Sequence, residues 1–458
     1  MFLKQLEISQ IRAIEHAALD FRGESAAGAG AMRQRTVLIG DNACGKSTVL
    51  RAAALVLAGT EALNAAGAQP GWLGEPATWV RNGQKQGHIR AVLTPEKGAD
   101  ITVALTLQPG WSLRQTLAKN QKSLQALDAA LAQSARRYFT LAYGASRRPS
   151  RLAQVGASSK AASAPANAAR ASASPLQRSG QLAGLLSPDA ALVAFEPWAA
   201  GLSAPGKAAL RALLKALLPG VAVAGIDASG GQVVFKTADG SIPFAQLSLA
   251  HQTLIAWCGD LLYRVGQAFG AAASPLKTSG LLLLDELELH LHPLHQRGVL
   301  EALSAALPNL QIMATSHSPM VVQQLRPGEL VLLERATPQR GATARVAQGD
   351  PSQLTLGQLM APMFGIDSTD STRVAALRSR ARSSPGLLAA RDHIELASLS
   401  PIHQLPPALQ AQLQATTELT EAVARSAGQR APKLDPAKLR EKMGERIQSA
   451  ALRVGGGT

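Results

Sequence analysis

An eight-residue segment, Gly40-Asp41-Asn42-Ala43-Cys44-Gly45-Lys46-Ser47, constrains the fold of this 458-residue chain more than any other feature. It matches the pattern G-x-x-x-x-G-K-[S/T], in which glycines let successive backbone N–H groups turn toward phosphate oxygens. A short apolar run, Thr36–Ile39, precedes it, and a helical pattern, Lys46–Leu57, follows it. A buried strand, a tight loop and the positive end of a helix together form a binding site for phosphate groups. The segment therefore predicts an α/β fold built around a phosphate-binding loop.

The side chains of this loop have distinct expected roles. We expect Lys46 to contact the β- and γ-phosphates of ATP and to act in catalysis, and the Ser47 hydroxyl to bind Mg²⁺. Cys44 is interpreted as a small filler of the loop, with redox sensing as the alternative. The predicted nucleotide-binding residues of the loop are Gly40, Asp41, Asn42, Ala43, Cys44, Gly45, Lys46, Ser47 and Thr48.

An acidic pair follows the most apolar strand pattern of the chain, Gly280–Leu284. A carboxylate at the carboxyl end of a buried parallel strand lies beside the phosphate loop, so we expect Asp285 to hold Mg²⁺ together with Ser47. The neighbouring Glu286 is placed to polarise an attacking water as a general base.

Histidines follow two apolar strand patterns, Gly280–Leu284 and Gln311–Thr315. The run Gln311–Thr315 places His317 at the same sheet edge as Asp285, where an imidazole can hydrogen-bond a γ-phosphate or the attacking water; the alternative is a histidine that caps a helix. The cluster formed by His290, His292 and His295 either binds a metal or hydrogen-bonds and packs at a strand-to-helix turn. The lack of a nearby cysteine or second ligand cluster favours packing.

Composition bounds the class of protein. Hydrophobic residues make up 46% of the chain but aromatic residues only 3%, so its core must consist mostly of Ala, Leu and Val. Two cysteines, Cys44 and Cys258, indicate a reducing compartment and no disulfide framework. No uncharged apolar run approaches the ~20 residues of a membrane span, and the residues up to Glu7 carry no signal-peptide hydrophobic region. We expect a soluble, cytoplasmic protein with no membrane partner.

Positive charge is unevenly distributed along the chain. The 46 Lys and Arg against 31 Asp and Glu leave a formal charge of +15. Residues 131–180 contain eight Lys or Arg and no acidic residue, and Val155–Pro175 within them is rich in Ala and Ser. We interpret this stretch as a solvated insertion that is either an inert linker or a contact for nucleic acid, which makes DNA a candidate partner.

The rest of the chain alternates strand and helix patterns. Gln232–Phe235 and Ile242–Ala245 flank an Asp239-Gly240 turn and predict a hairpin. We expect Gly23–Met32 to be a loop and Leu330–Leu333 to be the last strand, because no later alternation is long enough for another sheet. The other expected strands are Phe2–Ile8, Ile14–Phe21, His88–Leu93 and Ile101–Leu107, and the other expected helices are Leu113–Arg137, Ala190–Leu218 and Ala250–Phe269.

Two motifs closely resemble the ABC-type ATPases of the RecF/OLD-like group, which are also classed as AAA-family ATPases. These motifs are Asp285–Pro293 and Ala314–Pro319. The phosphate loop, the hairpin that ends at Leu247-Ser248, and the segment Ala142–Arg147 are similar to that group as well. The resemblance covers roughly residues 1–340.

This resemblance implies an ATPase head that works in pairs. In such enzymes a signature serine of one subunit contacts the γ-phosphate bound by the other, and Ser248 is the matching position. His317 matches the switch histidine of the group. Two departures stand out: Ala250 occupies a position that is usually glycine, where a Cβ restricts close approach to phosphate, and the Q-loop glutamine has no evident counterpart in its expected place, Tyr143-Gly144.

The patterns and the resemblance together predict a P-loop NTPase of ABC-ATPase type. It should have a mixed sheet with an antiparallel β subdomain, a helical lid insertion and a helical C-terminal tail. The expected division is 1–112 for the N-terminal part of the head, 113–230 for the helical lid with the basic insertion at about 145–180, 231–340 for the C-terminal part of the head, and 341–458 for a basic helical region.

The expected function is an ATP hydrolase that acts as a nucleotide-driven switch, as a homodimer or higher homo-oligomer joined through ATP, in antiphage defence or DNA metabolism. Lys46 and Ser248 lie 202 positions apart, which fits an inserted lid, and no sustained heptad repeat separates them. OLD-family proteins carry a TOPRIM nuclease after the head, whereas the residues beyond Leu333 show no sheet pattern for one. A separate effector nuclease is therefore expected, similar to the stand-alone ATPase subunits of Septu and PARIS systems. The alternatives are an ATP-dependent assembly scaffold with slow turnover and, less favoured, a transporter-type ATPase subunit.

Overall fold

The computed structural model describes residues 2–25, 28–67, 76–95, 99–133, 139–147, 149, 175–187, 190–226, 232–269, 276, 278–337, 339–366 and 371–383. The chain divides into two compact units, Met1–Gly365 and Ile366–Thr458. All described strands belong to the first unit, and the second is described chiefly over helix α14 (Thr372–Ser383). Among the described residues, no helix combines the length and the apolar character that crossing a membrane requires.

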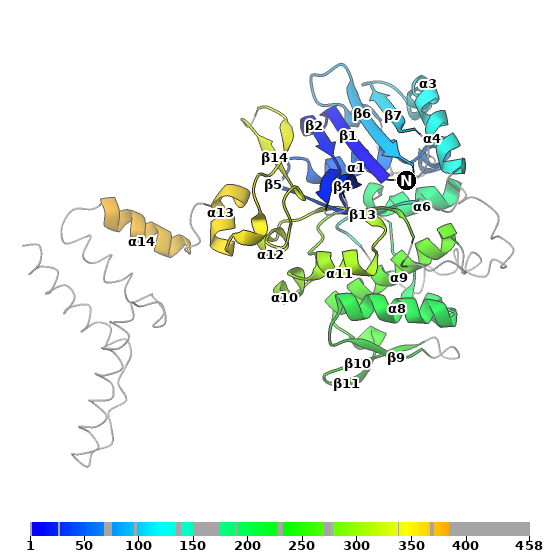
Figure 1. Ribbon diagram of the computed structural model, residues 1–458, viewed down its shortest axis with the longest axis vertical. Coiled ribbons are helices and arrows are strands. Elements are labelled where there is room, and N and C mark those ends of the chain that lie inside the picture. The colour runs from blue at the N-terminus through cyan, green and yellow to red at the C-terminus, as the bar shows by residue number, and fades with distance from the viewer. Residues whose placement is uncertain are drawn as a thin grey trace, which may run out of the picture. The chain divides into compact units, whose positions relative to one another are not determined.

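The first unit alternates strands and helices (Figure 1). Its strands are β1 (Phe2–Ile11), β2 (Ile14–Asp20), β3 (Arg22–Ser25), β4 (Gly28–Met32), β5 (Arg35–Gly40), β6 (Gly87–Thr94), β7 (Ile101–Leu107), β8 (Phe139–Tyr143), β9 (Ala222–Ile226), β10 (Val233–Thr237), β11 (Gly240–Pro243), β12 (Gly280–Leu284), β13 (Leu310–Thr315), β14 (Leu330–Arg335) and β15 (Ala342–Val346). Its helices are α1 (Lys46–Val56), α2 (Thr60–Gly67), α3 (Leu113–Lys119), α4 (Gln121–Gln133), α6 (Pro175–Leu186), α7 (Phe195–Ala200), α8 (Ala204–Leu217), α9 (Leu249–Phe269), α10 (Pro293–Gln296), α11 (Val299–Ala306), α12 (Pro319–Val322) and α13 (Leu356–Phe364).

Ten strands form one mixed sheet in the order β7-β6-β1-β2-β15-β14-β5-β13-β12-β8. From β14 to β8 neighbouring strands run parallel, whereas β7, β6, β1 and β2 pair antiparallel. Strand β15 joins the two halves, because it pairs antiparallel with β14 and parallel with β2. The predicted mixed α/β sheet with an antiparallel part is confirmed, and β9, β10 and β11 form a separate three-stranded sheet that includes the predicted hairpin.

The parallel strands are buried on both faces. Because side chains alternate along a strand, Leu281 and Leu283 of β12 enter one core with α1, whereas Leu282 and Leu284 enter a second core with α8, α9 and α11. Figure 1 shows these last three helices together on one side of the sheet, with β9–β11 beyond them. The first core also contains the inner faces of β1, β6 and β7, so α1 lies enclosed between the two halves of the sheet, with nine of its 11 residues buried.

A buried glutamine connects the two halves of the sheet. The Gln311 side chain in β13 accepts a hydrogen bond from the backbone N–H of Leu3 in β1 and donates one to the Leu3 carbonyl oxygen, both at 2.9 Å. Strands β13 and β1 are not neighbours in the sheet, since β2, β15, β14 and β5 lie between them. The sheet must therefore curl for these groups to meet, and the amide takes the place of a missing strand neighbour.

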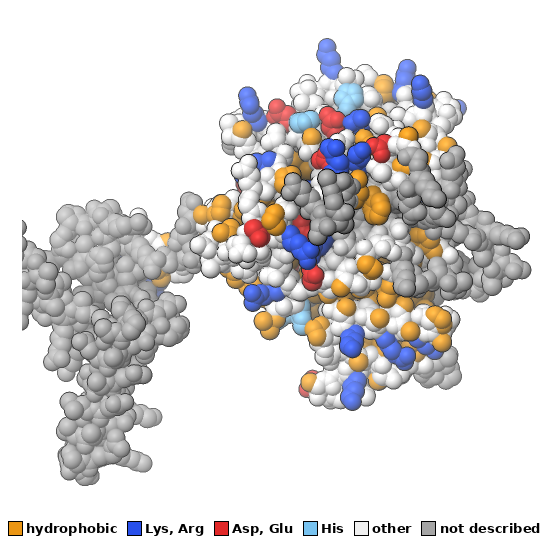
Figure 2. All heavy atoms as spheres, in the orientation of Figure 1, with side chains coloured by type: hydrophobic (Ala, Val, Ile, Leu, Met, Phe, Trp, Pro, Cys, Tyr) orange, Lys and Arg blue, Asp and Glu red, His pale blue; other side chains and the backbone are white. Residues whose placement is uncertain are grey.

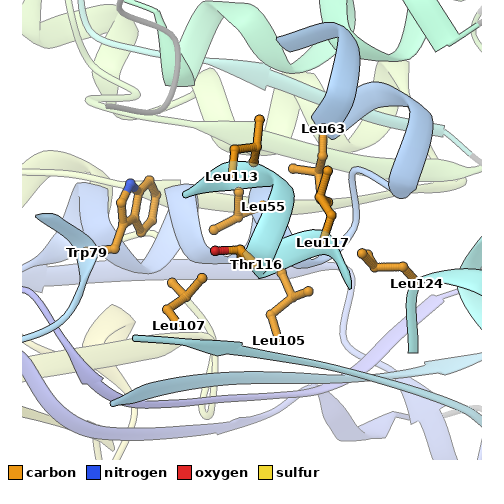
Figure 3. Close-up of a pocket in the computed structure, with 9 residues that line it drawn as sticks. All are labelled: Leu55, Leu63, Trp79, Leu105, Leu107, Leu113, Thr116, Leu117 and Leu124. Atoms are coloured by element: carbon orange, nitrogen blue, oxygen red, sulfur yellow. The ribbon is translucent and has the colours of Figure 1, made fainter. Parts of the chain in front are cut away.

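A small apolar cavity lies in the first core beneath α3 (Figure 3). Its volume of about 20 Å³ is room for a single water molecule at most. The Thr116 hydroxyl, the side-chain oxygen of the lining, donates to the carbonyl oxygen of Ser112 at 3.0 Å. The lining residues are Leu55, Leu63, Trp79, Leu105, Leu107, Leu113, Thr116, Leu117 and Leu124. Such an apolar gap stays dry and belongs to the packing of the core.

Five short strands were not predicted from the sequence: β3, β4, β8, β9 and β15. The predicted loop over Gly23–Met32 is wrong, because β3 and β4 pair there as a hairpin. The expectation that Leu330–Leu333 is the last strand is also wrong, because β15 follows and extends the same sheet. Strand β8 lies within the predicted lid segment, yet it pairs along its whole length with β12. Each of these strands has four or five residues, too few for periodicity to reveal, and pairing with neighbours decides its state.

The functional division of the chain stays a prediction. The segment 113–230 does contain helices α3, α4, α6, α7 and α8, in addition to strands β8 and β9. Residues 150–174, the middle of the predicted basic insertion, lie outside the described residues. So do residues 384–458, most of the predicted C-terminal helical region, of which α13 and α14 are described.

Replacing Gln311 with leucine should strongly destabilise the first unit. The variant keeps the size of the side chain but leaves the N–H and carbonyl groups of the fully buried Leu3 without partners. The expected cost is about 2–4 kcal/mol in the free energy of unfolding, measured by denaturant unfolding. The exposed Gln84 is the matched control, and Gln84→Leu should change this free energy by less than about 0.5 kcal/mol. Equal stabilities of the two variants would contradict the role of Gln311.

Candidate functional site

The phosphate loop lies where the sequence predicted it, between the end of β5 and the start of α1. Its backbone is left-handed at three positions: φ is 145° at Gly40, 61° at Ala43 and 106° at Gly45. Left-handed residues interspersed with ordinary ones are the geometry in which successive N–H groups form a concave anion site. Gly45 is also the N-cap of α1, so the positive end of that helix faces the same site.

Two glycines allow the loop to pack tightly on neighbouring strands. A Cβ added to Gly40 would lie 2.2 Å from the carbonyl oxygen of Leu333 in β14. A Cβ added to Gly45 would lie 2.5 Å from Cδ1 of Ile14 in β2. Both halves of the curled sheet therefore hold the loop in place, and the requirement for glycine is steric as well as conformational.

The ammonium group of Lys46 is held by backbone carbonyl groups of the phosphate loop. Lys46 Nζ donates to the carbonyl oxygens of Gly40 at 2.8 Å and Asp41 at 2.9 Å. From the other side, Arg335 of β14 donates to the Ala43 carbonyl oxygen at 2.7 Å, a contact the sequence did not reveal. Burial raises the pKa of the Cys44 thiol. A raised pKa disfavours the reactive thiolate, which supports the interpretation of Cys44 as a filler.

The two residues predicted to hold Mg²⁺ are in contact. Ser47 Oγ donates to Asp285 Oδ1 at 2.9 Å, and the buried Thr315 hydroxyl donates to the same oxygen at 2.7 Å. Among the described residues, no group of three or more His, Cys, Asp or Glu side chains could hold a metal ion. A hydroxyl and a carboxylate fit Mg²⁺ in this setting, because that ion completes its shell with phosphate oxygens and water.

The predicted general base has an unusual backbone. Glu286 follows Asp285 at the end of β12 and is left-handed, with φ of 52°. Its N–H donates to Thr315 Oγ1 at 2.7 Å, and its carbonyl oxygen accepts from Arg147 Nη2 at 2.8 Å. Arg147 and Thr315 both lie outside the set of site residues predicted from the sequence.

His317 follows β13, and its backbone is held by Glu288 of the loop after β12. Its backbone N–H donates to Glu288 Oε1 at 2.6 Å. The alternative role of His317 as a helix cap is wrong, because Ser318 is the N-cap of α12 and accepts from the N–H of Val321. His317 is exposed and lines the cavity described next.

The predicted residues meet in one open cavity of about 240 Å³. Its lining includes predicted residues from the phosphate loop, the acid pair and the histidine, namely Asn42, Ala43, Gly45, Lys46, Ser47, Thr48, Asp285, Glu286 and His317. Ala13 and Thr315 also line it, and neither was predicted. Gly40, Asp41 and Cys44 belong to the loop without lining the cavity.

Ser248 lies elsewhere on the surface. It immediately precedes the 21-residue helix α9 and is exposed, as is Leu249 beside it, at 68%. Its Oγ accepts from the His251 N–H at 3.3 Å and lies 2.9 Å from His251 Nδ1. Ser248 therefore caps α9 and does not line the cavity of its own chain.

The three neighbouring histidines form no metal site. His292 is the N-cap of α10, where its Nδ1 accepts from the N–H of Leu294 at 3.3 Å. His290 is exposed and left-handed, with φ of 65°, so it turns the chain. In the described part of the chain these histidines form no group that could hold a metal ion, and the contacts of His292 are those of the packing interpretation.

The fold and the site together define a P-loop ATPase domain of the ABC type: a phosphate loop after β5, an acid pair after the nearby parallel strand β12, and a histidine after β13 between them. More particularly, the chain belongs to the family described as "AAA domain, putative AbiEii toxin, Type IV TA system", whose model matches residues 35–323.

Relatives of known name match parts of the chain. The "Septu protein PtuA" of Bacillus mycoides (strain KBAB4) is 24% identical over 372 residues, which are 80% of this chain and 45% of that protein. The "Retron Ec83 probable ATPase" of Escherichia coli is 32% identical over 94 residues, 20% of this chain and 17% of that protein. The matched regions thus span less than half the length of these relatives. Among solved structures, the "SmcHead bound to the C-winged helix domain of ScpA" aligns with a TM-score of 0.43 and 11% identity, covering 76% of this chain and 98% of that one.

Substituting Gly40 with alanine should weaken nucleotide binding and destabilise the unit. The new Cβ would meet the backbone of Leu333, so the phosphate loop must shift. A cost of about 1–3 kcal/mol is expected in the free energy of unfolding, and titration with a fluorescent ATP analogue should show lower affinity. Gly298→Ala is the control, because nothing lies within 4 Å of a Cβ there and its φ is −108°. Unchanged affinity in Gly40→Ala would contradict the steric role of this glycine.

Proposed function

We propose that this chain is an ATP hydrolase that works as a nucleotide-driven dimeric switch in antiphage defence, together with a separate effector. The observation that carries the proposal is the single cavity in which Lys46, Ser47, Asp285, Glu286 and His317 meet. These are a phosphate-binding cation, two ligands for Mg²⁺, a general base and a γ-phosphate contact, the set that ATP hydrolysis requires.

Binding uses the loop and its lysine. Backbone N–H groups of the phosphate loop and the N-terminus of α1 receive the phosphates. Lys46 then exchanges the carbonyl oxygens of Gly40 and Asp41 for phosphate oxygens. Ser47 and Asp285 would hold Mg²⁺, which supplies charge neutralisation on the β- and γ-phosphates when bound.

Hydrolysis uses the groups at the ends of β12 and β13. Glu286 accepts a proton from the attacking water as the water oxygen bonds to the γ-phosphorus and the bond from phosphorus to the bridging oxygen breaks. His317, on the same cavity, donates a hydrogen bond to the γ-phosphate and orients it. Both carboxylates of the acid pair line the cavity, which supports separate roles in metal binding and base catalysis.

The position of Ser248 supports a dimeric switch. Ser248 is exposed and outside its own cavity, so its hydroxyl is available to a nucleotide held by a second copy. The adjacent Leu249, at 68% exposure, offers apolar area that a second copy would bury. ATP bound between two copies would then join them, and hydrolysis would release them.

The resemblance to Septu protein PtuA and to retron ATPases supports a role in antiphage defence with a separate effector. DNA stays a candidate partner on grounds of charge. Helix α8 carries Lys207, Arg211 and Lys215 at intervals of four residues and no acidic residue, and Figure 2 shows basic side chains along this part of the surface. An assembly scaffold with slow turnover would use the same site, and a turnover rate measured in solution separates it from a hydrolytic switch.

Glu286→Gln should retain ATP binding but lose turnover by about 100-fold or more, because the amide cannot accept the proton of the attacking water. ATP would then stay bound and the dimer would persist. Phosphate release measures turnover, and sedimentation in the presence of ATP measures the dimer.

Lys46→Ala is the control for this experiment, since it should abolish binding itself. Hydrolysis by Glu286→Gln at the rate of the unaltered protein would exclude the general-base role.

Ser248→Arg should prevent ATP-dependent dimerisation while the monomer still binds nucleotide. The bulky cation would occupy the position from which a serine reaches the other copy's γ-phosphate, and light scattering with ATP in the Glu286→Gln background measures the result. Ser241→Arg, at an exposed serine of β11, is the matched control and should dimerise normally.

Because Ser248 also caps α9, thermal unfolding of Ser248→Arg should show a separate loss of about 1 kcal/mol. A fully dimeric and active Ser248→Arg would remove Ser248 from the switch.

A further inference from the structure

We propose that Arg147 and Thr315 are positioning residues, which hold the Asp285–Glu286 backbone in the conformation that presents both carboxylates to the cavity. The inference rests on the catalytic role proposed for Glu286 and names the groups on which that role depends.

The first observation is the backbone of Glu286 itself. A φ of 52° places a residue with a long side chain in the left-handed region, at a cost of about 1–2 kcal/mol. Such a conformation persists only where surrounding contacts outweigh the cost, and it concentrates at functional sites. At the end of the straight strand β12 it turns the chain abruptly, and both acids line the cavity directly after the turn.

Arg147 holds this turn by its carbonyl groups. Its Nη2 donates to the carbonyl oxygens of Asp285 at 2.5 Å and Glu286 at 2.8 Å, and its Nε donates to that of Gly144 at 3.3 Å. The side chain is 6% exposed, and the ring of Trp257 lies 5.6 Å from the guanidinium carbon. A single nitrogen thus bridges two consecutive carbonyl groups and fixes their relative direction.

The charge of Arg147 is costly in this place. Burial lowers the pKa of Arg147 to about 10, against the opposite effect of the nearby carboxylates of Asp285 and Glu288. Among the described residues, the three hydrogen-bond partners of the guanidinium are all backbone carbonyl oxygens. A buried cation whose described partners are carbonyl oxygens is an expensive structural element, which argues for a functional reason to retain it.

Thr315 holds the same turn from the opposite side. Its hydroxyl accepts from the Glu286 N–H at 2.7 Å and donates its one proton to Asp285 Oδ1 at 2.7 Å. The residue is 1% exposed, and its carbonyl oxygen accepts from the N–H of Leu287 at 2.9 Å. One hydroxyl therefore fixes both the backbone of the base and the carboxylate of the metal ligand.

Sheet register explains why these two residues meet the acid pair. Strand β12 lies between β8 and β13, and Leu284 is in register with Tyr143 on one side and Ala314 on the other. Asp285, Thr315 and the loop that carries Arg147 all follow these aligned positions. The acid pair is therefore held from both neighbouring strands at once.

Arg264 provides a comparison within the same region. It is a partly buried arginine of α9 whose Nε donates to the Asp260 carboxylate at 2.9 Å. Asp260 is completely buried, so loss of this ion pair would leave its charge without a cationic partner and destabilise the fold. Arg264 makes no hydrogen bond to the acid pair, so it is the structural counterpart against which Arg147 can be tested.

The decisive experiment compares Thr315→Val with Thr315→Ser. Valine keeps the shape and removes both hydrogen bonds, whereas serine keeps the hydroxyl. At saturating Mg²⁺ we expect Thr315→Val to lower kcat about 10- to 100-fold while the affinity for ATP changes less than about threefold, because only the reacting groups are misplaced. Thr315→Ser should return kcat to within about threefold of the unaltered protein.

A second comparison, of Arg147→Lys with Arg264→Lys, tests the role of Arg147. Arg147→Lys keeps the charge but cannot bridge two carbonyl oxygens in the same way, so it should lower kcat about 10-fold or more with ATP affinity retained. Arg264→Lys should lower thermal stability and leave kcat unchanged. If Arg147→Lys does not fold, the threonine pair still decides the matter.

The inference is overturned if Thr315→Val keeps full kcat, if valine and serine lower it equally, or if Arg264→Lys lowers kcat as much as Arg147→Lys. These outcomes differ from a failure of the proposed function. Glu286→Gln that hydrolyses ATP at the unaltered rate removes the proposed function, whereas an inactive Glu286→Gln beside a fully active Thr315→Val removes only the positioning role.

Discussion

The alignment of parallel strand ends is the constraint on which the rest of this molecule depends. Strands β5, β13 and β12 are neighbours in one sheet, and the phosphate loop, His317 and the acid pair each follow one of them. Because these parallel strands bring their carboxyl ends to one edge of the sheet, Ser47 Oγ and Asp285 Oδ1, from residues 238 positions apart in sequence, come within 2.9 Å. The curl of the sheet, closed by Gln311, brings Ile14 of β2 against Gly45 of the phosphate loop.

The parts of the site that follow local patterns could be predicted, and the parts that depend on pairing could not. The phosphate loop, Asp285, Glu286 and His317 each directly follow an apolar strand, and the structure brings all of them to one cavity. Strand β8 has only five residues and is specified by β12 beside it. For that reason the contribution of the following loop stayed hidden: Tyr143-Gly144 was the expected place of a missing glutamine, and the residue that this loop sends to the acid pair is Arg147.

Helix α9 runs from an exposed end into the interior of the first unit. Its first turn carries the exposed cap Ser248, and three turns later Asp260 is completely buried. There Asp260 accepts a hydrogen bond from the Tyr143 hydroxyl at 2.9 Å and one from the N–H of Val193 at 2.8 Å. Burial raises the pKa of Tyr143 well above its usual value, which keeps that hydroxyl a donor. A rigid helix thus joins the proposed contact with a second copy to the last residue of β8, next to the acid pair.

The way Lys46 rests on its own loop has a consequence for what the cavity admits. The two carbonyl oxygens that hold its ammonium group are an internal competitor for any incoming molecule. A neutral nucleoside carries no charged oxygen to replace these carbonyl oxygens, so Lys46 would stay bound to its own loop. In the proposed function, a triphosphate would replace these two partial charges with the full charges of its phosphate oxygens, to which an ammonium group hydrogen-bonds more strongly. The contacts that Lys46 makes with its own loop would therefore favour ligands that carry negative charge.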